Sequence, residues 1–173
     1  MKDLNLISGQ KVKTLGYYSV NDGGDGLYLI SENAPTTFYE TLDNGNYAEL
    51  IFNNEINVKQ FGAHGDGTTD DSTFIQTAIN EIRTYTLNKD NPYELITLNF
   101  PAGTYKITQT INLSPLVKIN TIGTVIFESY NNGTCFKILP NINDNSEWYN
   151  YNGKYITSSD GIMIVNKYGS TSN

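Results

Sequence analysis

The sequence predicts a mainly β protein in which a small β-rich module and a single helix lead into a β-solenoid. Three observations predict this fold. Short aromatic and β-branched runs, separated by turns rich in glycine and asparagine, fill most of the chain. One helical period occurs, at residues 72–85. After it, short apolar pieces recur every several residues, which is typical of the successive sides of solenoid coils.

Composition narrows the class of protein. The chain has 173 residues, enough for one ordinary domain or two small ones, and its 38% apolar content allows a packed core. The net charge of −7, with only 11 Lys and Arg, argues against a nucleic-acid partner. No long apolar run is present, so we expect no membrane insertion. The single cysteine, Cys135, excludes an intrachain disulfide and is expected to be a small buried residue of a strand.

Residues 1–54 are interpreted as a small β module. Its expected strands are the aromatic and β-branched runs LGYY, LYLI and YAELI at 15–18, 27–30 and 47–51. Asn44-Gly45 is expected to form a hairpin turn, because both residue types accept positive φ.

The acidic, glycine-rich segment NDGGDG at residues 21–26 has more than one interpretation. A phosphate loop is excluded because no Gly-Lys-Ser/Thr follows. Asp22 and Asp25 are oxygen donors for calcium, but they fall short of the six to eight oxygens that calcium usually takes. A plain turn is therefore favoured, and no metal or cofactor is expected.

The segment from Val58 to Ile82 is the strongest structural signal. Residues 55–60 form a short link, a turn with three glycines reverses the chain, and a helix is expected from Ser72 to about Tyr85. Asp70 or Asp71 is expected to supply the N-cap oxygen. A helix placed before short strands is what the open first coil of a solenoid needs, since that coil otherwise exposes apolar side chains and unpaired backbone.

Strand patterns follow the helix. Residues 96–107 alternate as a strand with a corner at Pro101–Gly103, and KYITSSDGIMIV predicts one more pair of strands. No strict repeat is present, and a two-sheet sandwich has similar spacing. The short strands expected between these two regions are residues 111–113, 116–119, 124–127 and 135–139.

Two motifs in this region resemble a known family. VKQFGAHGDGTTDDSTFIQTAI (58–79), followed by FPAGTY (100–105), resembles the entry motif of pectate-lyase-like right-handed β-helix proteins in bacteriophage tailspikes, tail fibres and preneck appendages. TLGYYSVNDGGDGLYLI and NYAELI resemble the virion-attachment module that precedes many such helices. The resemblance covers about Lys13 to Phe136. It implies a head- or tail-binding module at 1–54 and, at 55–173, a cap helix with the first coils of a right-handed parallel β-helix. We expect this to be the front portion of a longer polypeptide, because no second cap is visible.

The function implied by this resemblance is that of a phage tail structural protein. It would anchor to other virion proteins through residues 1–54 and begin a β-helix that binds host surface polysaccharide. A homotrimer, assembled in the host cytoplasm and located in the virion, is implied as well. The alternative is a polysaccharide depolymerase, either a lyase or a glycoside hydrolase, acting on bacterial capsule or cell-wall glycan. We do not expect the 173-residue chain itself to be an enzyme.

An acidic cluster beside His64 has both a catalytic and a structural interpretation. Paired carboxylates hydrolyse glycosides at defined separations, but carboxylates in a Gly-Asp-Gly turn and at a helix start are also stabilising there. The structural interpretation is favoured, and no catalytic residue is assigned. Trp148, Tyr149 and Tyr151 are candidates to stack on sugar rings, to pack a loop onto the solenoid, or to line a subunit contact. The predicted structural cap consists of Asp66, Asp70, Asp71, Phe74, Ile75, Ala78, Ile79 and Ile82.

Overall fold

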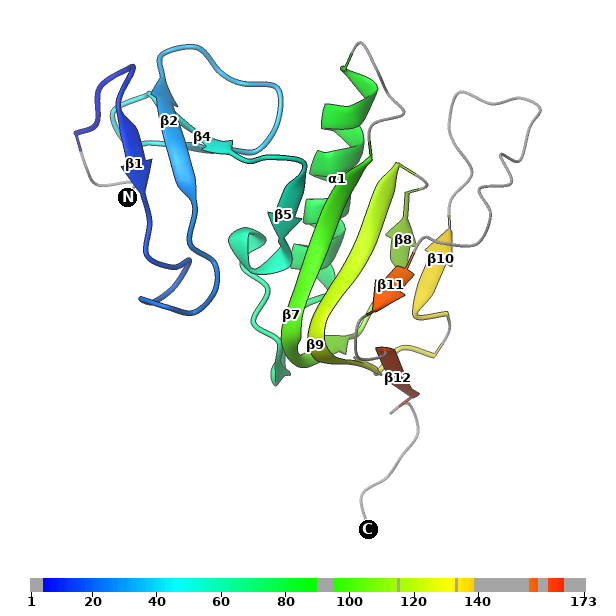
Figure 1. Cartoon of the computed structure of the whole chain (residues 1–173). Helices are drawn as coiled ribbons and strands as arrows, with labels where there is room; N and C mark the ends of the chain where they lie inside the picture. Colours follow the sequence, from blue (N-terminus) through cyan, green and yellow to red (C-terminus); the bar gives the residue numbers. More distant parts are fainter. Residues whose placement is uncertain are drawn as a thin grey trace.

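The computed structural model shows a small antiparallel sheet, on the left of Figure 1, and a stack of parallel strands with one helix against it. It describes residues 5–89, 95–114, 116–132, 134–138, 156–158 and 162–166. Trp148, Tyr149 and Tyr151 lie outside the described residues.

The small antiparallel sheet has the strand order β1-β2-β4-β3. Its strands are β1 (Lys11–Lys13), β2 (Leu27–Ser31), β3 (Tyr39–Thr41) and β4 (Tyr47–Ile51). The hairpin expected at Asn44-Gly45 joins β3 to β4, with Gly45 at φ 86°. The strand expected at residues 15–18 was wrong. These residues form part of the β1–β2 loop, where the backbone N–H groups of Tyr17 and Tyr18 bond to the Asp22 side chain.

The parallel stack begins at residue 55 and consists of two ladders. In the longer ladder, β5 and β6 pair with β7, β7 pairs with β9, and β9 pairs with β11 and β12. In the shorter ladder, β8 pairs with β10. The elements are β5 (Glu55–Asn57), η1 (Val58–Phe61), β6 (Asp66–Asp70), α1 (Ser72–Leu87), β7 (Ile96–Ile107), β8 (Ile111–Leu113), β9 (Val117–Ser129), β10 (Phe136–Ile138), β11 (Ile156–Ser158) and β12 (Ile162–Asn166).

Every pair in this stack is parallel, which confirms the solenoid interpretation. Residues on successive coils lie in register, as in the row formed by Ile56, Leu98 and Ile119. An antiparallel two-sheet sandwich, the other architecture compatible with the spacing, does not describe this pairing. The protein is therefore mainly β and forms the start of a parallel β-helix.

Three local predictions were wrong. The link at 55–60 is the strand β5 followed by the 3₁₀ helix η1, which Asn57 and Gln60 close with a capping box. The corner at Pro101–Gly103 is a register shift within the continuous strand β7. Two strands were expected at 116–119 and 124–127. Apart from residue 116, these residues belong to the single strand β9, because β7 continues to pair with it across the gap.

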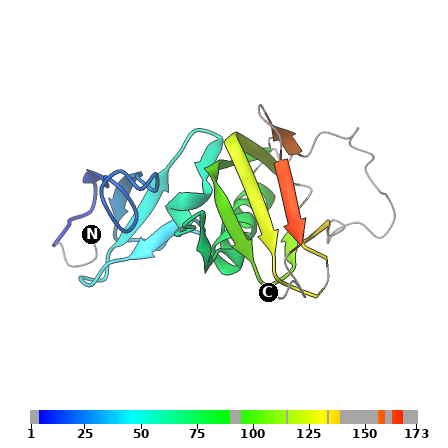
Figure 2. The same cartoon turned by 90° about the horizontal axis from the view of Figure 1, so that it is seen from below.

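The helix α1 begins at Ser72, as expected, and ends at Leu87, two residues beyond the expected end. Its buried apolar residues are Ile75, Ala78, Ile79 and Ile82, whereas Phe74 is half-buried. Figure 2 shows α1 against the parallel strands, at the end of the stack nearer the antiparallel sheet. Within the described residues, no helix is long and apolar enough to span a membrane.

The hydrophobic core runs from the module into the coils without interruption. Ile30 and Leu50 of the antiparallel sheet belong to the same buried cluster as Ile79 of α1 and Leu98 of β7. The module and the solenoid start therefore share one core, which fixes the module against the first coil.

Candidate functional site at the start of the solenoid

The acidic turn at residues 62–71 is the first part of the candidate site. Asp71, fully buried, stands at the N-cap position of α1, but its carboxylate makes no capping bond to the helix. Its Oδ1 accepts a hydrogen bond from the backbone N–H of His64 at 2.7 Å, and its Oδ2 accepts one from Gly65 at 3.0 Å. Of the two aspartates expected to supply the N-cap oxygen, Asp71 therefore does not, because its carboxylate faces back into the turn.

Asp70 supplies the oxygen at the helix start instead. Its Oδ1 accepts from the backbone N–H of Ser72 at 3.1 Å and from the Ser72 hydroxyl at 2.6 Å. Its Oδ2 accepts from the hydroxyl of Thr108, which follows β7. Asp70 therefore ties the start of α1 to the turn that leads into the next side of the solenoid.

Asp66 stabilises the turn from its exposed side. Its Oδ1 accepts from the backbone N–H groups of Thr68 and Thr69, both at 2.8 Å, and its Oδ2 accepts from the Thr69 hydroxyl at 2.9 Å. This is the bonding of an aspartate to its own turn that the Gly-Asp-Gly sequence predicts.

The pKa values of these three carboxyls follow from their surroundings. Backbone hydrogen bonds from Thr69 and Thr68 hold the pKa of Asp66 well below its usual value. Partial burial acts to raise the pKa of Asp70, but bonds from Ser72 and Thr108 outweigh it and lower that pKa. Burial raises the pKa of Asp71, and the bonds from His64 and Gly65 only partly oppose this.

A raised carboxyl pKa can mark a general acid, but the geometry around Asp71 favours a structural role. Both of its oxygens accept backbone N–H groups, and it is fully buried. Gly62 at φ 93° turns the chain beside it, and a Cβ there would lie 2.9 Å from the Tyr18 hydroxyl. The three carboxylates thus hold a tight turn against the start of the helix.

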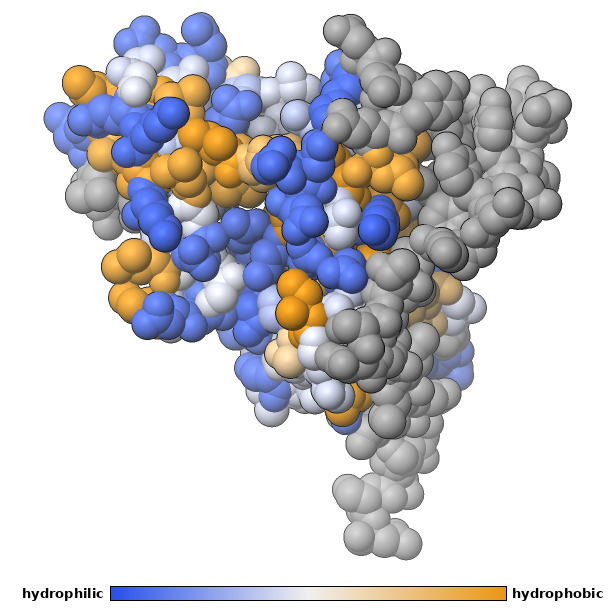
Figure 3. Space-filling view, in the orientation of Figure 1, coloured by the Kyte–Doolittle hydropathy of each residue, from blue (hydrophilic) through white to orange (hydrophobic). Residues whose placement is uncertain are grey.

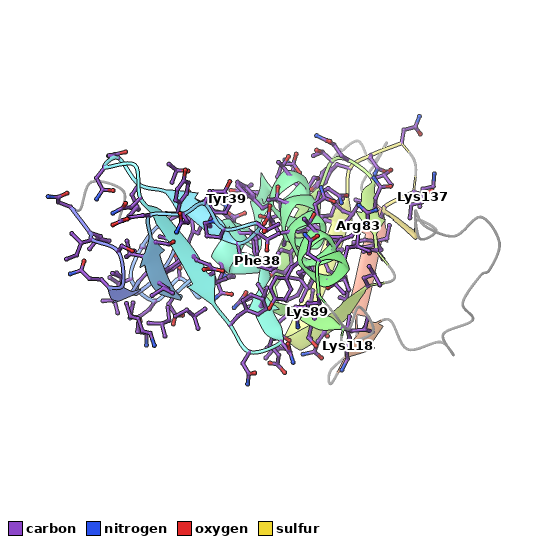
Figure 4. The ribbon with its side chains drawn as sticks, turned by 90° about the horizontal axis from the view of Figure 1, so that it is seen from above. Phe38, Tyr39, Arg83, Lys89, Lys118 and Lys137 are labelled. Atoms are coloured by element: carbon purple, nitrogen blue, oxygen red, sulfur yellow. The ribbon has the colours of Figure 1, made fainter. Side chains whose placement is uncertain are left out.

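The second part of the site is the joint between the module and α1. The ring of Phe38 packs against Phe52, Phe61 and Tyr85, with centroid distances of 4.8, 6.0 and 5.4 Å. Its backbone N–H donates to Oε2 of Glu81 at 2.7 Å. Phe38 holds φ at 57°, a conformation that bulky residues avoid unless packing and hydrogen bonds impose it. Figure 4 shows Phe38 beside α1, at the edge of the module.

No local pattern predicts this joint. Phe38 lies in a run that contains no recognised motif, and Glu81 follows it by 43 residues. The one related signal is the helical period, which assigns Glu81 to the face of α1 away from the buried stripe.

The glycine-rich turn at 21–26 joins the module to the coil from the other side. Its backbone carbonyls at Gly23 and Asp25 accept from the side-chain amides of Asn57 and Gln60, at 3.1 and 2.8 Å. The Asp22 carboxylate accepts the backbone N–H groups of residues 17, 18, 19 and 24. These oxygens face N–H donors, as in a plain turn. Among the described residues, no group of three or more acidic, histidine or cysteine side chains is placed to hold a metal ion.

The module carries most of the exposed large hydrophobic residues in the described part of the chain. Leu15 and Val20 in the β1–β2 loop are 59% and 65% exposed. Among the exposed large hydrophobic residues in the described part of the chain, only Leu87, Ile122 and Tyr130 lie outside the module. Figure 3 shows hydrophobic residues gathered over the antiparallel sheet and at the end of the loop below it. Apolar patches of this kind mark contact surfaces more often than chance.

Two hollows on the surface of the described residues are lined in part by the module. The larger, about 460 Å³, lies between the segment after β2 and the end of α1, where Thr37, Tyr85 and Lys89 line it. The smaller, about 160 Å³, is lined by Tyr17, Lys59 and His64 among others. Neither hollow contains Asp66, Asp70 or Asp71, so the predicted cap residues and the hollows are separate.

A family model described as rhamnogalacturonase A/epimerase, pectate lyase-like, matches residues 55–173. No curated protein matches the chain. Among solved structures, the tailspike protein of Acinetobacter baumannii phage AM24 is 19% identical with a TM-score of 0.59, and the match covers 78% of this chain and 22% of that protein. The likeness to this tailspike is one of fold.

Two further solved structures are similar at lower scores. Pantoea stewartii WceF, described as a glycan biofilm modifying enzyme with a bacteriophage tailspike-like parallel beta-helix fold, is 18% identical with a TM-score of 0.45, over 93% of this chain and 25% of that one. ORF18 of Geobacillus virus E2 is 24% identical with a TM-score of 0.44, over 79% of this chain and 27% of that one. The chain spans well under half the length of each of these proteins.

Proposed function

Because the chain belongs to the pectate-lyase-like family described as rhamnogalacturonase A/epimerase, we propose that it acts in a bacteriophage tailspike, tail fibre or appendage. In this proposal residues 1–54 attach the protein to the virion. Residues 55–173 begin the β-helix that binds host surface polysaccharide. The fold shared with the phage AM24 tailspike supports this proposal.

The observation that carries the proposal is where the apolar surface lies. The module exposes Leu15 and Val20 on a loop that Asp22 holds with four backbone hydrogen bonds. A rigid loop loses little conformational entropy on binding, so its exposed apolar groups are available for a protein contact. The module is also joined to α1 through Phe38 and Glu81. A mechanical force applied to the module is therefore passed to the solenoid through this contact.

The bonding of the acidic turn supports initiation of the β-helix as the work of residues 55–173 in this chain. Asp66, Asp70 and Asp71 accept hydrogen bonds from the turn, the helix start and the segment after β7. These hydrogen bonds stabilise the first coil, and they give the three carboxylates a structural role. Further parts of the proposal are a homotrimer, contact with other virion proteins, and a location in the phage tail.

The proposal of attachment is tested by phage particles that carry variants of this protein. Leu15→Asp with Val20→Asp places two charges on the exposed loop, and we expect the protein to be depleted from purified particles by about tenfold or more, since charges replace apolar contact. Ile122→Asp is the matched control, because Ile122 is a similarly exposed residue on β9, at 53%. Equal incorporation of both variants, measured by mass spectrometry of the particles, would contradict the proposal.

A second candidate function is depolymerisation of capsule or cell-wall glycan, which the wording of the family description favours. Incubation of the 173-residue chain, and of the product of the natural reading frame, with host surface polysaccharide separates the two functions. Oligosaccharides released by the product of the natural reading frame, and not by the 173-residue chain, would locate the chemistry outside these residues. Release by the 173-residue chain would overturn the view that these residues serve only attachment and initiation.

A further inference from the structure

Gln76 lies within the long motif at 58–79 but belongs neither to the acidic turn nor to the buried stripe of α1. Its side-chain amide reaches the backbone of a strand that follows 36 residues later. The Nε2 donates to the carbonyl oxygen of Asn112 at 3.2 Å, and the Oε1 accepts from the N–H of the same residue at 2.7 Å. Both backbone hydrogen-bonding groups of one residue in β8 are therefore satisfied by one side chain.

This contact lies on the edge of β8 that faces away from β10. Asn112 stands opposite Lys137 in the parallel pairing of β8 with β10, while its neighbour Ile111 donates its N–H toward that side, to the carbonyl of Cys135. Successive residues of a strand direct their backbone groups to opposite sides. The Asn112 groups thus point toward α1, where a preceding coil would otherwise supply a strand.

A glutamine side chain ends in the same amide that a peptide unit contains. It can therefore take the place of one residue of a neighbouring strand. Two further side chains lie at four-residue spacing along α1, so all three share one face of the helix. Ser72 bonds to the segment just before β8, and Asn80 bonds to Gln76 itself. The Ser72 hydroxyl accepts the N–H groups of Thr108 and Gln109 at 2.9 and 3.2 Å, and the Asn80 Oδ1 accepts from Gln76 at 3.1 Å.

We propose that this polar stripe, Ser72–Gln76–Asn80, serves as a surrogate strand for the β8–β10 sheet. It closes the edge of β8 at the first coil and sets the position of α1 along that edge. It also blocks the edge against pairing with a second copy of this chain, since an open strand edge is a template for association. The proposal rests on these bonds alone and holds whether or not the protein attaches to a virion.

The test uses the 173-residue chain with Gln76→Leu, which keeps the approximate size of the side chain and removes both bonds. The matched control is Gln109→Leu, the same change at an exposed position near the stripe. Hydrogen exchange of the Asn112 amide is expected to become about tenfold faster or more in Gln76→Leu, because an opened edge meets water. The amide of Leu98 should keep its wild-type rate. Light scattering should show dimers or larger species at rising concentration, with the control unchanged.

Gln76→Glu provides a second variant that keeps the proposal testable if Gln76→Leu does not fold. The ionised side chain of this variant accepts from the Asn112 N–H but repels its carbonyl, whereas the protonated side chain offers both a donor and an acceptor. Exchange at Asn112 relative to wild type is therefore expected to be faster at pH 7 than at pH 4. If the Asn112 amide of the variant that folds exchanges at the wild-type rate, the proposal of a surrogate strand is overturned. Faster exchange in a protein that stays monomeric at every concentration would overturn the block on self-pairing.

Discussion

Two turns with similar sequences, NDGGDG at 21–26 and HGDGTTDD at 64–71, use their aspartates in opposite surroundings. In the first, slight burial acts to raise the pKa of Asp22, but four backbone N–H groups outweigh it and lower that pKa. In the second, Asp71 is fully buried and collects two such groups, and burial raises its pKa. The two turns have similar residues, but moving the carboxylate out of water costs more free energy for Asp71 than for Asp22.

This difference separates the two regions of the molecule. The module turn is stabilised by bonds that water could replace if they were lost, so its failure should be local. In the turn at the solenoid start Asp71 is fully buried, so the loss of its hydrogen bonds leaves a buried group without a partner. We therefore expect damage to the solenoid start to cost more than matched damage to the module.

The largest expected effect comes from a charge on the buried stripe that supports the second turn. Ile79 is 1% exposed, and Ile79→Asp should abolish soluble folding, with a loss of more than about 4 kcal/mol. An exposed residue of the same helix serves as the control, since Thr77→Asp also adds a charge to α1. Soluble yield and a thermal melt followed by circular dichroism measure both. A melting curve of Ile79→Asp that matches wild type would contradict the placement of this stripe.

The next prediction compares the two aspartates directly. Asp71→Ala leaves the N–H groups of His64 and Gly65 without their acceptor inside the protein, at an expected cost of about 2–4 kcal/mol. Asp22→Ala should cost less, about 1–2 kcal/mol, since water can reach the released N–H groups. Urea unfolding of the two variants beside wild type gives both values. An Asp22→Ala loss equal to or larger than that of Asp71→Ala would remove the distinction between the regions.

The sequence alone predicts only part of this difference between the two turns. The glycine and aspartate pattern predicted both turns, and the helical period predicted the start of α1 and its buried stripe. The burial of Asp71 depends on coils that follow it, so no local pattern carries it. Residues 15–18 have strand-forming side chains, yet the N–H groups of Tyr17 and Tyr18 bond to Asp22 in place of a neighbouring strand.

Contacts between residues far apart in the sequence could not be predicted from it either. The expected break at Pro101–Gly103 became a register shift because β9 continues to pair on both sides of it. A Cβ at residue 103 would lie 2.6 Å from the carbonyl oxygen of Gly65. Glycine at residue 103 is therefore explained by this close approach and not by a corner. The pair Phe38–Glu81 joins residues 43 positions apart and has no local signature. Proximity of this kind follows only from the complete fold.

The smallest expected effect is on the pH dependence of stability. Asp22 and Asp66 have pKa values below the ordinary value of about 3.9, so they contribute stability at neutral pH that is lost as the pH falls below about 4. Asp71 has a raised pKa, so its contribution runs the other way and declines as the pH rises from about 4. The urea midpoint between pH 3 and 7 should therefore fall less on acidification in Asp22→Ala, and more in Asp71→Ala, than in wild type. Equal acid slopes in all three proteins would contradict these assignments.

The most direct test of the account is whether parallel coils stack behind α1. In the structure Ile56, Leu98 and Ile119 stand in register on three successive strands, β5, β7 and β9. Methyl nuclear Overhauser spectra of the chain should therefore connect Ile56 to Leu98 and Leu98 to Ile119. Absence of both connections in a folded sample would show that the strands do not stack in this order, and the solenoid start described above would be wrong.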